Sequence, residues 1–82
     1  MPTAAFTITS AWQKAADGPL NVLIPAHDDF QWAITAGAAP SLSLSVCPRV
    51  QGGDTLSLTL ASGESLYVAA HQGFATTVTT GA

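Results

Sequence analysis

Strict alternation of apolar and polar residues is the feature that most constrains what this chain can fold into. Seven short runs show it, and a period of two residues is typical of a β-strand with one face buried. In the run 56–60, for instance, leucines alternate with Ser57 and Thr59. The seven runs are 6–8, 20–24, 30–34, 42–46, 56–60, 66–70 and 74–80.

Turn-forming residues separate these runs, notably at 17–19, 51–54, 62–64 and 72–73. The pattern predicts an all-β fold: a small antiparallel β-sandwich or barrel of about seven strands, forming a single domain over residues 1–82. Gly52-Gly53 is expected to form a hairpin turn. The segment 11–16 is a helical candidate but is too short to stand alone, so Trp12 is predicted to belong to the end of the first strand.

The parity of each run predicts which side chains face the interior. A slip of one residue in register would reverse the prediction for that strand. Tyr67 has the opposite parity to its neighbours, so its ring is predicted to face outward or into an interface. The residues expected to share one interior are Phe30, Trp32, Ile34, Leu56, Leu58, Leu60, Leu66 and Val68.

Charged residues are scarce: they make up 9% of the chain, against about 25% in an ordinary soluble domain. A soluble monomer usually stays dispersed through interspersed surface charge. Much of this surface is therefore predicted to be covered by a partner. The deficit favours one piece of an assembly over a freely diffusing enzyme.

The same composition argues against two classes of partner. Phosphate binding needs several Lys or Arg on one face, whereas this chain has two basic residues and a net charge of −3. No apolar run approaches the roughly 18 residues of a membrane span. No basic amphipathic segment is present to bind anionic lipid. We therefore expect neither nucleic acid nor a membrane as partner.

Cys47 is the single cysteine, so no disulfide can form within the chain. It directly follows the run 42–46 and extends it with one more apolar residue. A thiol in such a place usually acts as a small buried hydrophobe. Residues 1–4 lack the basic and apolar regions of a signal peptide. We expect the protein to be made in the cytoplasm and not to be exported by the general route.

His27-Asp28-Asp29 is the densest polar cluster in the chain. Its imidazole and carboxylates could bind a metal together with His71. The cluster also lies between two predicted strands, where Asp commonly stabilises a tight turn by accepting hydrogen bonds from its own backbone. A Ca²⁺ site needs more oxygen ligands than this tripeptide supplies, so we predict a turn and no metal site.

No catalytic or cofactor-binding residues are predicted. The chain lacks the Gly-x-Ser-x-Gly elbow of serine hydrolases. Gly52-Gly53 lacks the Lys and Ser or Thr that complete a nucleotide-binding loop. A pair of catalytic carboxylates could be drawn only from Asp28, Asp29, Asp54 and Glu64, and a sandwich of this size leaves little pocket to hold them.

Three residues are candidates for an interface: Tyr67, Arg49 and Trp12. Aromatic rings on a flat sheet can also stack on sugars, which makes Tyr67 and Trp12 candidates for carbohydrate binding. Arg49 could pair across a subunit boundary with Asp54 or Glu64, or be a solvated loop residue.

About half of the chain has a recognisable sequence pattern, in the segments 30–34, 53–60 and 62–70. A Gly-Asp-Thr start leads into one strand, and Gly63-Glu64 precedes Leu66-Tyr67-Val68 in the next. In this the chain resembles small β-sandwich structural proteins of tailed bacteriophages. Such proteins decorate or stabilise capsids, or serve as tail- or fibre-associated parts. The resemblance carries no catalytic residues.

The composition predicts a non-enzymatic part of an assembly, and the resemblance implies that it is a virion structural protein, made in the host cytoplasm, that decorates and stabilises a capsid. Its expected partners are the major capsid protein or another virion protein, and further copies of itself in a homo-oligomer such as a trimer. Two alternatives stay open: a tail- or fibre-associated structural protein, and a carbohydrate-binding β-sandwich module.

Overall fold

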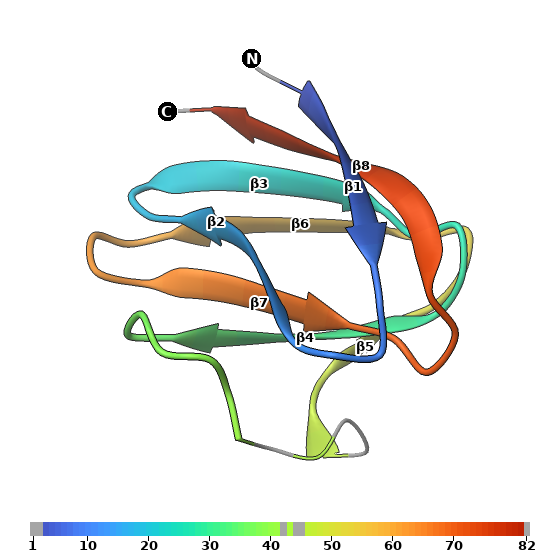
Figure 1. Ribbon diagram of the computed structural model, residues 1–82. Helices are drawn as coiled ribbons and strands as arrows, with labels where there is room; N and C mark the ends of the chain where they lie inside the picture. The colour runs from blue at the N-terminus through green and yellow to red at the C-terminus, as the bar shows by residue number, and fades with distance from the viewer. Residues whose placement is uncertain (1–2, 42, 44–45, 82) are drawn as a thin grey trace.

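The computed structural model of the protein describes residues 3–41, 43 and 46–81 and is an all-β sandwich (Figure 1). Two four-stranded antiparallel sheets pack face to face, which confirms the predicted fold class. Eight strands are present among the described residues, one more than predicted. They are β1 (Thr3–Ile8), β2 (Gln13–Asp17), β3 (Leu20–Pro25), β4 (Phe30–Thr35), β5 (Arg49–Val50), β6 (Thr55–Leu60), β7 (Ser65–Ala69) and β8 (Phe74–Gly81).

The strand order gives the sandwich the topology of a jelly roll. One sheet has the order β1-β8-β3-β6 and the other β2-β7-β4-β5, so every connection except β4–β5 crosses from one sheet to the other. Four of these connections meet at one end of the sandwich, here called the loop end. They are 9–12, 26–29, 51–54 and 70–73. The start of β1 and the end of β8 lie toward the opposite end (Figure 1).

The core lies between the two sheets and contains most of the predicted residues. Phe30, Leu56, Leu60, Leu66 and Val68 are buried, as their parity predicts, and Trp32 and Leu58 are partly buried against them. The prediction for Ile34 is wrong, because this side chain is 37% exposed. It is the last residue but one of β4, at the rim of the sandwich, so the correct parity does not bury it.

The structure corrects the predicted elements at two places. β2 occupies the segment that contained the helical candidate, and Trp12 lies in the β1–β2 connection, because β1 ends at Ile8. The predicted strand 42–46 lies partly outside the described residues. Its two described members, Ser43 and Val46, are not in a strand, and Val46 is 68% exposed.

The Gly52-Gly53 turn is not a hairpin, contrary to the prediction. It joins β5 in one sheet to β6 in the other, because β5 pairs with β4 and β6 pairs with β3. Gly53 has a φ of +96°, a left-handed conformation that glycine adopts without steric cost. Its amide donates to the carbonyl of Ala26 at 2.7 Å, which ties this turn to the β3–β4 connection.

Candidate functional site

The outer face of the β1-β8-β3-β6 sheet is the first candidate surface. We call it the hydroxyl face, because Thr and Ser dominate the positions that alternate with the core residues. None of its members carries a charge. They are Thr3, Ala5, Thr7, Asn21, Leu23, Thr55, Ser57, Thr59, Ala75, Thr77 and Thr79.

Hydrogen bonds between neighbouring strands order part of the hydroxyl face. The hydroxyls of Thr3 and Thr79 lie 2.8 Å apart, and the hydroxyl of Thr59 donates to Oδ1 of Asn21 at 2.6 Å. Leu23 lies between Thr79 of β8 and Ser57 of β6 in the register of the sheet, and it is 37% exposed. Cross-strand pairs of this kind contribute to the stability of a sheet.

The outer side of the central strand β7 in the other sheet is instead buried within the protein, and we call it the covered face. The charged residues Lys14, Asp17 and Arg49, on the edge strands of that sheet, stay exposed. Ser65, Tyr67 and Ala69 of β7 alternate with the core residues of that strand, yet they are 3%, 7% and 0% exposed. The β4–β5 connection contacts β7, and the β1–β2 connection contacts the residue that follows the end of β7. The hydroxyl of Tyr67 donates to the carbonyl of Gly37 at 3.1 Å, and the amide of Ala70 donates to the carbonyl of Thr9 at 2.9 Å.

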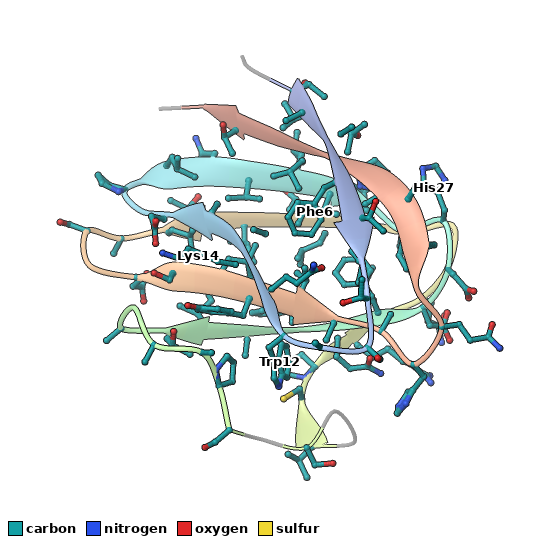
Figure 2. All side chains as sticks on the ribbon, viewed as in Figure 1. Phe6, Trp12, Lys14 and His27 are labelled. Carbon is teal, nitrogen blue, oxygen red and sulfur yellow. The ribbon has the colours of Figure 1, made fainter. Side chains whose placement is uncertain are left out.

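These contacts correct the sequence-based prediction for Tyr67. The parity is right, because the ring lies on the side of β7 away from the core. The predicted outward exposure is wrong, because the β4–β5 connection covers the ring. Trp12 is half-buried in the β1–β2 connection, just before β2 (Figure 2). An interface role for Trp12 stays a prediction.

A polar hollow at the loop end is the second candidate site. Its volume is about 260 Å³, and its lining comes from the β3–β4 connection, β4, β5 and the β7–β8 connection. Its lining combines carboxylates with basic and amide side chains, so the hollow can both donate and accept hydrogen bonds. The lining residues are Asp28, Asp29, Gln31, Arg49, His71 and Gln72.

Hydrogen bonds confirm that Asp28 stabilises its own turn, and they show that Asp29 joins this turn to the β5–β6 connection. Asp28 Oδ1 accepts from the amide of Asp29 at 2.8 Å, and Asp29 Oδ1 accepts from the amide of Gly52 at 2.7 Å. The ring of His27 contacts Phe74 edge-on, with centroids 6.4 Å apart. The described residues contain no group of three or more His, Cys, Asp or Glu side chains placed to hold a metal ion.

Arg49 contacts Asp29 within the chain, and its pairing with Asp54 or Glu64 across a subunit boundary stays a prediction. Its guanidinium lies 3.9 Å from Oδ2 of Asp29, and both side chains are about half exposed. Neither Asp54 nor Glu64 is its partner within the chain; Glu64 Oε1 accepts from the amide of Ala61 at 2.6 Å instead. Solvent competes strongly for an exposed pair at this distance, so it contributes little to stability. The guanidinium therefore remains available to a ligand.

Gln31 is the residue of the hollow that sequence reasoning missed. It lies on the outer side of β4, at a position that alternation assigns to solvent, yet it is only 6% exposed. Its Oε1 atom is buried and accepts no hydrogen bond from the described residues. A buried amide oxygen without a donor is uncommon, because the cost of removing it from water is not repaid.

Cys47 was predicted to be a buried hydrophobe, and it is half-buried in the β4–β5 connection. Its thiol lies 3.5 Å from the carbonyl oxygen of Ser43, which it can contact as a weak donor. The cysteine is a free thiol.

Comparison of the chain with protein-family models, with curated proteins and with solved structures gives no match. No helix within the described residues has the length and apolar character needed to span a membrane.

Proposed function

We propose that the protein is a non-enzymatic structural component of a virion, and that it joins neighbouring copies or the major capsid protein through the hydroxyl face. The observation that carries this proposal is the contrast between the two outer faces. One is covered by the chain itself along its central strand β7 and carries charged residues on its edge strands, and the other is an uncovered sheet surface without a charged residue. Capsid decoration is the favoured role, on the resemblance to phage structural proteins, and a tail- or fibre-associated position is the alternative.

The size of the face suits a specific interface. The molecule measures 30 × 25 × 16 Å, so its broad side is comparable to the roughly 800 Å² per partner of a standard interface. Apolar surface contributes roughly 25 cal/mol per Å² buried, before the costs of association. Repetition over many copies in a lattice then multiplies a modest contact.

The chemistry of the face also favours association. Removing a charge from water is costly, whereas hydroxyl groups lose less and can pair with a partner's hydroxyls or backbone. The cross-strand bonds of Thr3 and Thr59 already hold some of these side chains in place. Less side-chain entropy therefore remains to be lost when a partner binds.

Sedimentation in low salt and in about 1 M NaCl tests the proposal, first on the protein alone and then with capsids. The Debye length at 1 M is roughly 3 Å, so contacts between exposed charges are screened while uncharged contacts persist. We expect association that survives the high salt. Thr77→Lys places a charge on the hydroxyl face and should abolish it. Ser62→Lys places the same charge in the β6–β7 turn and should not.

Two outcomes would count against the proposal. A protein that stays monomeric and ignores capsids in both salts would contradict the assembly role. Association that is lost in high salt, or equally weakened by both lysine variants, would keep an assembly role and discard the hydroxyl face as its surface. Carbohydrate binding through a Tyr67–Trp12 pair needs an accessible tyrosine ring, and the ring of Tyr67 is buried.

A further inference from the structure

We propose that the polar hollow at the loop end binds a small neutral polyhydroxylated ligand, of the chemical class of a monosaccharide. This inference is independent of the assembly role, because the hollow and the hydroxyl face are made of different residues. It rests on the buried amide oxygen of Gln31, on the mixed charge of the lining and on the size of the hollow.

Gln31 points to a ligand that can donate hydrogen bonds. Its side chain is 94% buried, lines the hollow and has an Oε1 atom without a donor among the described residues. The neighbouring carboxylates can accept further bonds, because Asp28 uses Oδ1 for the amide of Asp29 and Asp29 uses Oδ1 for the amide of Gly52, which leaves their Oδ2 atoms. A hydroxyl group supplied by a ligand would satisfy Gln31 and the remaining carboxylate oxygens.

The charge of the lining favours a neutral ligand over an ion. Two carboxylates oppose an anion, and a cation meets carboxylates that the guanidinium of Arg49, 3.9 Å from Asp29, already partly neutralises. Hydroxyl groups can donate to Asp28 and Gln31 and can also accept from Arg49 and Gln72. A ligand with several adjacent hydroxyls matches a lining that offers both donors and acceptors.

The volume limits the size and affinity of the ligand. At about 260 Å³ the hollow lies just below the roughly 300–1,000 Å³ of pockets for drug-sized molecules. All lining residues except Gln31 are exposed, so water competes for the same groups. We expect dissociation constants on the order of 1 to 10 mM for single sugar rings.

Amide chemical shifts measured by NMR during titration would test the inference. The probes are galactose, mannose, N-acetylglucosamine and sorbitol, with methylammonium as the cation and inorganic phosphate as the anion. At least one hydroxylated probe should shift the amides of Gly52, His71 and Gln72 in a saturable way. The two ions should not do so at the same concentration.

Two variants and a matched control show which residues bind. Arg49→Gln and the nearly isosteric Gln31→Met should each weaken binding about tenfold, as expected when a buried or charged hydrogen-bonding group is lost. Lys14→Gln changes the other cation of the chain, on β2, and should leave the affinity unchanged. Should Gln31→Met fail to fold, Arg49→Gln decides alone.

The inference is overturned if no hydroxylated probe shifts these amides, or if methylammonium or phosphate binds in their place. Equal affinities of Arg49→Gln and Lys14→Gln would also overturn it, because they would place the ligand outside the hollow.

Discussion

The two outer faces of this sandwich differ although the two sheets are built alike. Each sheet has four antiparallel strands with alternating side chains. On the hydroxyl face, Leu23 is 37% exposed between threonine and serine neighbours, whereas Tyr67 on the covered face is 7% exposed beneath the β4–β5 connection. Alternation therefore tells which side chains point away from the core, but not whether they meet water. That second property depends on long connections and on partners.

The largest expected effect is a difference in stability between a variant on the covered face and a variant on the hydroxyl face. Tyr67→Ala removes a buried ring and should lower the free energy of unfolding by about 3–5 kcal/mol, the usual cost of truncating a buried aromatic residue. Thr77→Ala, on the hydroxyl face, should stay within about 0.5 kcal/mol. Urea unfolding of both variants measures the difference. Similar values for the two would mean that the covered face is no more buried than the other.

A finer substitution isolates the contact between the covered face and the β4–β5 connection. Tyr67→Phe keeps the ring and removes only the hydroxyl, which donates to the carbonyl of Gly37 at 3.1 Å. We expect a loss of about 0.5–1.5 kcal/mol in the free energy of unfolding. Hydrogen exchange should also speed up in the segment 36–38, with the β3–β6 pair as an internal control. Unchanged exchange in 36–38 would show that the hydroxyl does not hold the connection in place.

On the hydroxyl face a smaller effect is expected. Thr59→Val removes the bond from the threonine hydroxyl to Oδ1 of Asn21 but keeps the shape and the β-branching of the side chain. Both groups are exposed and can bond to water instead, so the free energy of unfolding should change by no more than about 0.5 kcal/mol. A loss above 1 kcal/mol would indicate that the face stabilises the monomer and is not simply left open for a partner.

The sequence predicted the fold class and most of the core because those depend on a period of two residues. Phe30, Leu56 and Leu66 follow that period and are buried. β2 escaped prediction because its pairing with β7 shifts register between Lys14 and Ala16, which interrupts the alternation. β5 has only two residues, Arg49 and Val50, too few to show a period.

The candidate sites were harder to predict because they join segments that are distant in the chain. The sequence identified the turn at Asp28 and Asp29 but not the contact between Arg49 and Asp29 within the chain. Gln31 resembled an ordinary solvent-facing residue of an alternating strand. Its burial comes from tertiary packing, which no local pattern records.

The smallest expected effect is a change in stability with pH, and it concerns Asp17. This residue lies at the edge of the covered face, where β2 pairs with β7. Its Oδ1 accepts from the hydroxyl of Ser65 at 2.5 Å, and Lys14 Nζ lies 3.3 Å from its Oδ2. The Ser65 hydroxyl lowers the pKa of Asp17 below its ordinary value of 3.8, and Lys14 acts in the same direction, while desolvation opposes them. The ionised form is therefore favoured in the folded state.

A lowered pKa in the folded state means that the ionised carboxylate stabilises the fold above pH 3.8, and that this contribution is lost as the pH falls through the folded value. Asp17→Asn should therefore lose less stability than the parent protein between about pH 5 and pH 2. Asp54→Asn, at the loop end, controls for the loss of one negative charge. Ser65→Ala should move the pKa of Asp17 upward in an NMR titration. An unchanged pKa would mean that the hydroxyl of Ser65 is not the cause of the shift. This edge of the covered face would then be less tightly ordered than the 3% exposure of Ser65 indicates.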